Sequence, residues 1–321
     1  MARVSAIVAA ILLLGMLSTQ VESFSFSVGD FYAANISSSI ITQYDTSGAI
    51  KGSLTVTLPS NGRDLRGLAF GPDGLLYATV AQSSGFSVLA LDSYGTVQRT
   101  YTHTAYISGD IGYGAICFDN SGYFYVAAGG TGLVRFNTAA PSSVDIINRE
   151  YGVHDVEVLP SGNILMATSQ FIFELNRQGQ MIRWITPSDP NHLVIGDSPS
   201  FTDIQGIEYD PASNSLFVTA IGASGYYHKL TRVNAITGVV EACAIVSGGE
   251  HMILSNDGRL IVGNASYSTR VFSTSLESLG YFAGNTFPFV TQYVPVPEPS
   301  TFIALVGGLG SLLALRRHRR K

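Results

Sequence analysis

The middle of the chain repeats one pattern of apolar and polar positions at intervals of roughly 40–50 residues, a spacing typical of repeat folds. Each copy contains a short apolar run, a turn rich in Asp, Asn, Pro and Gly, and a second apolar run. This order predicts a β-hairpin. Five copies of the hairpin pattern are present, in residues 67–78, 115–126, 155–166, 206–218 and 251–262.

Further strands follow each predicted hairpin. A third apolar run occupies residues 87–91, 132–136, 171–175, 229–233 and 269–272. A turn with Gly or Ser then leads to a more polar fourth run, as in residues 96–101 and 180–185. Four antiparallel strands in each repeat predict the blades of a β-propeller.

The two ends of the repeat array predict how the propeller closes. Residues 31–34, 40–44 and 49–54 supply the second, third and fourth strands of a first blade that has no first strand ahead of them. One spare strand, residues 287–293, follows the last copy. Pairing of the spare strand into the first blade would remove both open sheet edges. We therefore expect an all-β fold of six four-stranded blades within residues 24–293.

The copies resemble those of NHL-type and related six-bladed propellers, which share a Gly-hydrophobic-hydrophobic pattern followed by Asp-Gly and a second apolar strand. The resemblance covers residues 31–293 and implies a fold, which does not by itself imply a function. The chain has a single tryptophan, Trp184. One tryptophan cannot supply the repeated tryptophans of eight-bladed quinoproteins or of WD40 repeats, so both classes are disfavoured.

The N-terminus has the order of a secretory signal peptide. Arg3 precedes an apolar run, residues 4–17, and polar residues follow it. This arrangement predicts export, with residues 1–23 as the signal peptide and cleavage before Phe24. An uncleaved membrane anchor is the alternative.

The C-terminus, residues 294–321, combines a Pro-Glu-Pro motif, an apolar run and a basic cluster. Pro297, Glu298 and Pro299 precede a predicted helix over residues 301–315, and residues 316–321 carry five of the chain's cations. The apolar part, residues 302–315, would span only about 21 Å as a helix, less than the ~30 Å hydrocarbon core of a membrane. The basic end is expected to stay in the cytoplasm while the propeller lies outside the inner membrane.

This C-terminal segment closely resembles the PEP-CTERM sorting signal of bacterial proteins associated with exopolysaccharide. The resemblance covers about the last 26 residues and includes all three parts of the signal in order. It implies processing by an exosortase, with cleavage near Glu298 and transfer to the cell surface or the extracellular matrix. The membrane helix would then be an intermediate anchor. A simple tail anchor is the alternative reading.

The charge of the body limits the classes of partner, and the two cysteines are expected to be free thiols. Without the two terminal segments the body has 12 Lys and Arg against 21 Asp and Glu, a net charge near −9. An acidic body argues against nucleic acid and anionic polymers as partners, and is compatible with neutral glycans or cations. Cys117 and Cys243 are expected in an inner and an outer strand of different blades, and so as two buried thiols without a disulfide.

Candidate functional residues come from the start of each innermost strand, which lies at the mouth of a propeller's central channel. Polar and ionisable groups gather at this position, where ligands commonly bind. The predicted ligand-binding set is Arg66, Tyr113, His154, Asp155, Gln205, Glu250 and His251, with Asp64 and Asp203 nearby.

We call these residues around the channel mouth the ring, and two chemical hypotheses rest on it. His154, Asp155, Glu250 and His251 would suit Zn²⁺ or a similar divalent metal if they converge, against a hydrogen-bonded channel lining as the alternative. The chain lacks the Glu-Gly-Pro context of gluconolactonase-like propellers, so their hydrolase activity is not implied. The segment around His154 and Asp155 resembles arylsulfotransferase-type propellers over only four residues, which makes these two the candidate catalytic residues.

The repeated aspartates Asp73, Asp119, Asp210 and Asp257 lie in predicted hairpin turns, so turn formation accounts for them better than Ca²⁺ binding. The sequence therefore favours an exported, surface-sorted propeller that is a non-enzymatic binding or matrix protein associated with exopolysaccharide. An envelope lactonase, lyase or transferase that uses the ring at the channel mouth is the alternative.

Overall fold

The structure of the protein is a computed structural model that describes residues 24–35, 38–104, 114–149, 151–188, 203–221, 228–264, 266–282 and 287–294. Within these ranges every regular element is a β-strand, and no helix has the length and apolar character needed to cross a membrane. The predicted signal peptide, the Pro-Glu-Pro motif with its helix and basic tail, and Tyr113 lie outside the described residues.

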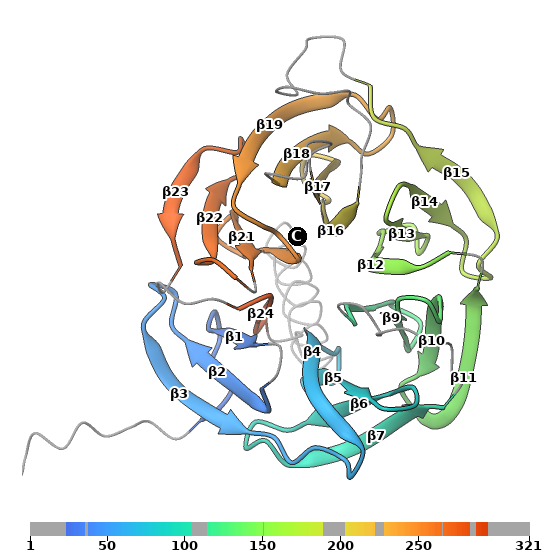
Figure 1. Ribbon diagram of the computed structural model, residues 1–321, viewed down its shortest axis with the longest axis vertical. Helices are drawn as coiled ribbons and strands as arrows, with labels where there is room; N and C mark the ends of the chain where they lie inside the picture. The colour runs from blue at the N-terminus through green and yellow to red at the C-terminus, as the bar shows by residue number, and fades with distance from the viewer. Residues whose placement is uncertain are drawn as a thin grey trace, which may run out of the picture.

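Six four-stranded antiparallel sheets are arranged around a central axis as the blades of a propeller (Figure 1). We number them I to VI in chain order and list their strands from the centre outwards. Blade I is β24 (Phe289–Gln292), β1 (Phe31–Ala34), β2 (Ile40–Tyr44) and β3 (Ile50–Thr55). Blade II is β4 (Gly62–Phe70), β5 (Leu76–Gln82), β6 (Phe86–Leu91) and β7 (Val97–His103). Blade III is β8 (Ile116–Phe118), β9 (Tyr123–Ala127), β10 (Leu133–Asn137) and β11 (Ala140–Asn148).

The second half of the ring continues in the same way. Blade IV is β12 (Val153–Val158), β13 (Ile164–Thr168), β14 (Ile172–Leu175) and β15 (Met181–Ile185). Blade V is β16 (Ile204–Asp210), β17 (Ser215–Ile221), β18 (His228–Asn234) and β19 (Val240–Val246). Blade VI is β20 (His251–Leu254), β21 (Arg259–Gly263), β22 (Arg270–Ser273) and β23 (Ser278–Tyr281). The predicted all-β propeller of six four-stranded blades is confirmed.

The ring closes in blade I by pairing the two ends of the propeller, as the sequence predicts. The last strand, β24, is antiparallel to β1, with Val290 opposite Ala33. Two backbone hydrogen bonds extend the pairing, from Gly29 N to the Tyr293 carbonyl and from Tyr293 N to the Asp30 carbonyl, both 3.0 Å. The closure therefore gives blade I an innermost strand from the far end of the chain.

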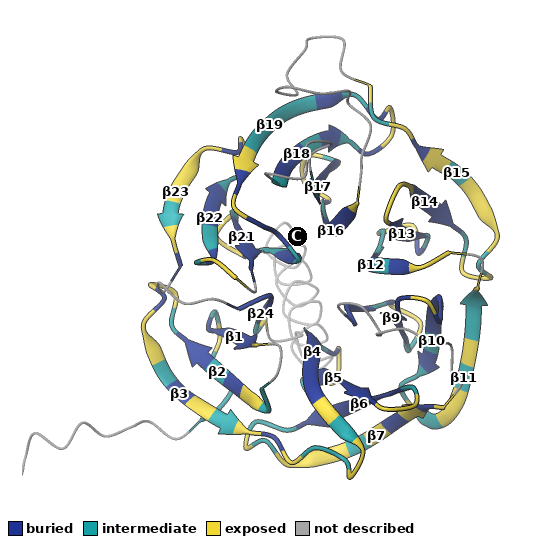
Figure 2. Cartoon of the chain, viewed as in Figure 1, coloured by how far each residue is buried: buried dark blue, intermediate teal, exposed yellow. Residues whose placement is uncertain are grey.

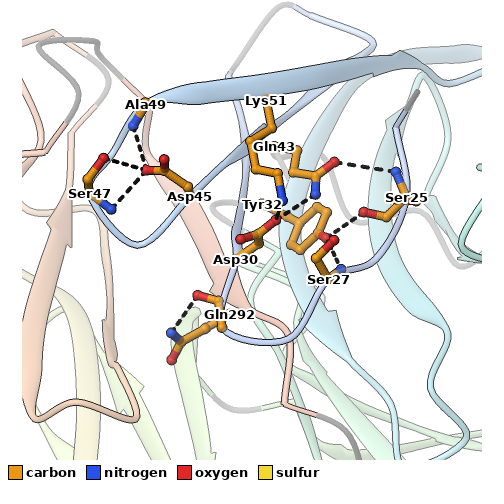
Figure 3. Close-up of polar contacts among 11 residues, drawn as sticks. Ser25, Ser27, Asp30, Tyr32, Gln43, Asp45, Ser47, Ala49, Lys51 and Gln292 are labelled. Atoms are coloured by element: carbon orange, nitrogen blue, oxygen red, sulfur yellow. Dashed lines mark hydrogen bonds and ion pairs between the residues drawn. The ribbon is translucent and has the colours of Figure 1, made fainter. Parts of the chain in front are cut away.

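Polar contacts fix the chain's entry into blade I (Figure 3). The Tyr32 hydroxyl donates to the Ser25 carbonyl at 2.9 Å and holds the segment that precedes β1. The carboxylate of Asp30 accepts from Gln43 Nε2 at 2.7 Å and from Lys51 Nζ at 2.8 Å, which links the start of β1 to β2 and β3. Because these bonds lie beside the β24–β1 ladder, they stabilise the closed ring.

The hydrophobic core lies between neighbouring blades. Most residues of the inner two or three strands of a blade are buried, and the outermost strands are the most exposed (Figure 2). Between blades II and III the fully buried rings of Tyr77 and Tyr101 pack against Phe124, with ring centroids 5.3 and 4.9 Å away. Large rings packed in this way fill the space between the facing sides of two sheets.

Three of the four repeated aspartates organise hairpin turns, as expected, whereas Asp257 accepts hydrogen bonds from Ser255 Oγ at 2.5 Å and from Arg259 Nε at 2.8 Å. Asp119 Oδ1 accepts hydrogen bonds from the backbone N–H groups of Ser121 and Tyr123, at 2.8 and 2.9 Å. Asp73 and Asp210 each accept one equivalent bond, from Leu75 and Ala212. Their hydrogen bonds are those of Asx turns.

The cysteine prediction is confirmed in its main point and corrected in one detail. Cys117 lies in inner strand β8 and Cys243 in outer strand β19, and both are free thiols. Cys117 is buried, whereas Cys243 is half-buried because β19 is the outermost strand of its blade.

Gly132, in the turn between β9 and β10, is required by both conformation and space. Its φ is +98°, and a Cβ there would lie 1.9 Å from the Asn148 carbonyl oxygen. We expect Gly132→Ala to lower the free energy of unfolding by about 2 kcal/mol. The matched control is Gly74→Ala, with φ +76° but no atom within 4 Å, which should cost only about 1 kcal/mol. Urea denaturation of both variants measures the difference, and equal losses would contradict the steric argument.

Candidate functional site

The predicted ring residues are placed by the innermost strands. His154 and Asp155 lie near the start of β12, Gln205 lies near the start of β16, and His251 begins β20 directly after Glu250. These strands surround the propeller axis (Figure 1). Arg66 lies within β4, which begins at Gly62 and carries a register shift between Leu65 and Leu68.

Both carboxylate oxygens of Asp155 accept hydrogen bonds from backbone N–H groups. Its Oδ1 accepts a 2.8 Å hydrogen bond from Val156 N and its Oδ2 accepts another of 2.8 Å from Ile207 N in blade V. Burial raises the pKa of Asp155 to about 7, and the two N–H donors oppose this rise. The side chain therefore links blade IV to blade V.

Three other candidates also contact groups of the protein itself, two of them backbone carbonyls and one a carboxylate. His154 Nδ1 lies 2.5 Å from the Ile204 carbonyl oxygen, across the same pair of blades as Asp155. Gln205 Nε2 donates to the Asp203 carbonyl at 3.2 Å. Buried Arg66 forms an ion pair with buried Asp64, with 2.9 Å between Nε and Oδ1.

His251 differs from the others because its ring lies in an apolar site. The imidazole is buried 6.4 Å, centroid to centroid, from the ring of Phe289 in blade I. Its Nδ1 has no hydrogen-bond partner within the described part of the chain. Burial lowers the pKa of His251 to about 4, so the imidazole is neutral at pH 7.

The structure does not support the metal hypothesis for His154, Asp155, Glu250 and His251. Among the residues that the structure describes, no group of three or more His, Cys, Asp or Glu side chains is arranged to hold a metal ion. His154 and Asp155 instead face backbone groups of blade V.

Sequence reasoning missed a pair of acids two positions further along the inner strands. Glu157 in β12 and Glu208 in β16 are hydrogen-bonded to each other through their side chains. Glu208 Oε1 also accepts a 3.0 Å bond from Leu254 N, so the pair connects blades IV, V and VI. A glutamate at the same position of two consecutive copies, where the other aligned copies have Ala69, Cys117 and Ile253, is the sequence signal that would have found it.

The acid pair favours proton retention. Burial raises the pKa of both Glu157 and Glu208. The nearby carboxylate of Asp155 adds to the rise in both, and the charge of Glu208 adds to the rise in Glu157. Both side chains keep some accessible surface, yet protein atoms surround them in the inner ring. Burial also raises the pKa of the Cys117 thiol, with these carboxylates adding to the rise, so the thiol stays protonated and is a poor nucleophile.

No protein-family model matches the sequence, and no curated protein matches it. Among solved structures, the chain is similar to a nidogen/laminin complex, with a TM-score of 0.58 and 12% identity over 82% of this chain and 97% of that chain. It is also similar to a functionally unknown protein of Desulfotomaculum acetoxidans, with a TM-score of 0.54 and 13% identity over 84% and 88% of the two chains.

A third similar structure is the Neurospora crassa Pan2 WD40 domain, with a TM-score of 0.51 and 10% identity over 85% of this chain and 78% of that chain. At such low identity these likenesses show the fold alone. The chain is a six-bladed β-propeller, and its function has to be argued from its own residues.

Proposed function

We propose that the protein is an exported, surface-sorted β-propeller that binds neutral glycans of an exopolysaccharide matrix without catalysing a reaction. The observation that carries the non-enzymatic part is the use of Asp155, whose two oxygens both accept backbone N–H bonds. A carboxylate used in this way supports the scaffold and is not available as a base or nucleophile.

The cellular location in this proposal is inferred from the two terminal segments of the sequence. Residues 1–23 direct export, and residues 294–321 hold the protein in the inner membrane with its C-terminus in the cytoplasm until an exosortase processes the Pro297–Glu298–Pro299 motif. The acidic body favours a neutral glycan over a nucleic acid or an anionic polymer. A lactonase, lyase or transferase built on the ring at the channel mouth stays an alternative prediction.

The test is a binding screen of the full-length protein and its Asp155→Ala variant against neutral oligosaccharides. We expect binding to at least one neutral probe without turnover of it. Asp155→Ala should lower the free energy of unfolding by about 2 kcal/mol, because two buried N–H groups lose their acceptor. Its affinity for the probe should stay within about twofold of the original, because the carboxylate acts in the scaffold.

Asp145→Ala is the matched control, because the Asp145 side chain is largely exposed in its ion pair with Arg135. It should change neither binding nor, by more than about 0.5 kcal/mol, stability. Absence of binding to every neutral probe would overturn the proposed function. Release of a cleaved product that depends on Asp155 would favour the enzyme alternative.

A further inference from the structure

A groove opens on the outer part of the molecule between blades III and IV. It has a volume of about 390 Å³ and is lined on the blade IV side by Phe173, Leu175 and Met181 and on the other side by Ile147 and Tyr151. The exposed rings of Phe171 and Trp184 continue this surface from Phe173. We call the whole surface the aromatic groove.

The strand pattern explains why these apolar side chains reach solvent. Phe171, Phe173 and Leu175 alternate along the β14 segment, and Trp184 lies opposite Phe173 in β15. Phe173 and Leu175 are buried in the cluster that packs blade IV against blade III. Towards the rim blade III no longer covers the sheet, and Trp184 is 51% exposed. The groove is thus the uncovered outer end of an interface between blades.

The rings of the aromatic groove hold one another in place. Phe173 is central: Tyr151 stacks on it at a centroid distance of 4.9 Å, and Trp184 meets it edge-on at 5.9 Å. Phe171 contacts Trp184 at 5.4 Å. Because exposed rings that pack together have little freedom left to lose, a ligand that stacks on them meets a preorganised surface.

The walls of the groove are also fixed. The turn after β14 approaches β11 so closely that a Cβ on Gly179 would lie 2.3 Å from the Ile147 carbonyl oxygen. Arg135 of blade III donates to the Arg177 carbonyl in this turn, and Arg177 donates to Ser121 Oγ of blade III, both at 2.8 Å. These bonds hold the two blades at a constant separation.

The chemistry of the lining indicates the class of ligand. Asn148 and Arg149 give the groove a polar edge, and no carboxylate is among its described lining residues. Flat aromatic faces accept the C–H groups of a pyranose ring, while amide and guanidinium groups hydrogen-bond its hydroxyls. A membrane-binding patch would need several flanking cations, and Arg149 is the one cation among the described lining residues.

We propose that the aromatic groove between blades III and IV is a glycan-binding site, in which a neutral hexopyranose unit stacks on Tyr151, Phe171 and Trp184. The inference rests on the proposed function and deepens it, because it moves the ligand from the channel mouth to the rim of the propeller.

The single tryptophan makes the test specific, because Trp184 is the only tryptophan of the chain and lies in the proposed site. Full-length protein is titrated with gluco-, galacto- and manno-hexaoses while tryptophan emission is recorded. Binding should shift the emission of Trp184 to shorter wavelength, because the sugar displaces water from a half-exposed ring. A hexuronate oligosaccharide at two salt concentrations is the charged comparison.

Alanine variants of the groove residues show which side chains contribute to the affinity for the sugar. Phe171→Ala and Tyr151→Ala should each weaken binding of the responding hexaose about tenfold in the emission titration. Trp184→Ala, measured by affinity electrophoresis, should weaken it at least as much. Tyr94→Ala is the matched control, since Tyr94 is a 79% exposed ring on blade II, and it should leave affinity unchanged. Thermal melts check that every variant is folded.

The remaining outcomes separate this inference from the proposed function. Binding of a hexaose with unchanged Trp184 emission, and unchanged affinity in the three groove variants, would overturn the groove and leave the proposed function standing. Binding of no neutral probe would overturn both. Emission that changes with protein concentration alone would assign the groove to a second copy of the chain, and tighter, salt-sensitive binding of the hexuronate would overturn the neutral ligand.

Discussion

Val290→Asp is expected to lower the free energy of unfolding by about 4 kcal/mol, because it places an unpaired carboxylate in the strand that closes the ring. Val290 is 0% exposed and lies in a cluster with Phe31, Phe282 and Phe287. Displacing β24 would leave β1 without its inner partner, and so expose a sheet edge. Chemical denaturation measures the loss.

Hydrogen exchange adds a local readout of the same substitution. The amides of β1 should lose protection before those of blades III and IV, since only blade I depends on the closing strand. Val294→Asp is the control: Val294 follows β24 and is 46% exposed, so an aspartate there should cost less than about 0.5 kcal/mol. Equal effects of the two substitutions, or uniform hydrogen exchange in all six blades, would contradict the role of β24 as the closing strand.

The success of the sequence prediction has a local cause. The predicted strands 31–34 and 40–44 coincide with β1 and β2, and the spare strand contains β24. Each is a short run of mostly apolar residues whose place follows from the repeat, which a sequence displays directly. The exception is β4, predicted to begin near Gly67 but observed from Gly62, because a register shift lets the ladder continue past Arg66.

The candidate site was harder to predict because an alignment gives a position and not a direction. It placed His154 and Asp155 at the start of β12, where the structure has them, but their side chains bond to the backbone of blade V. The aromatic groove was invisible for another reason. Phe171 and Trp184 fit the pattern of core positions, and only the packing of blade III determines that they remain exposed.

The acid pair makes stability depend on pH in a direction opposite to ordinary surface carboxylates. Burial places the folded-state pKa values of Glu157 and Glu208 above the unfolded value of 4.5, and that of Asp155 at about 7. The folded protein therefore binds more protons than the unfolded chain in this range. Their stabilising contribution is complete below the unfolded pKa values and is lost as pH rises through the folded ones.

The buried histidines determine the pH range in which the effect of the acids can be measured. Burial lowers the folded pKa values of His103, His228 and His251, so their contribution changes with the opposite sign, below the unfolded histidine value of 6.5. From pH 6.5 to pH 8.5 only the acids should dominate, and the free energy of unfolding should fall by about 3 kcal/mol. Urea denaturation at half-unit pH steps measures this fall.

Glu208→Gln tests whether the pair causes the dependence, because glutamine resembles a permanently protonated glutamate. Its Oε1 can still accept the bond from Leu254 N, and its Nε2 can donate a hydrogen bond to Glu157. We expect the variant to be more stable than the original at pH 8.5, by about 1 kcal/mol, and to lose part of the slope, because Asp155 and Glu157 stay buried and still titrate. Glu241→Gln, which removes a half-exposed partner of Arg232 on β19, should keep the slope unchanged. A slope unchanged by Glu208→Gln would mean that Glu208 does not contribute to the dependence, and a slope abolished by it would mean that Asp155 and Glu157 do not titrate in this range as their burial predicts.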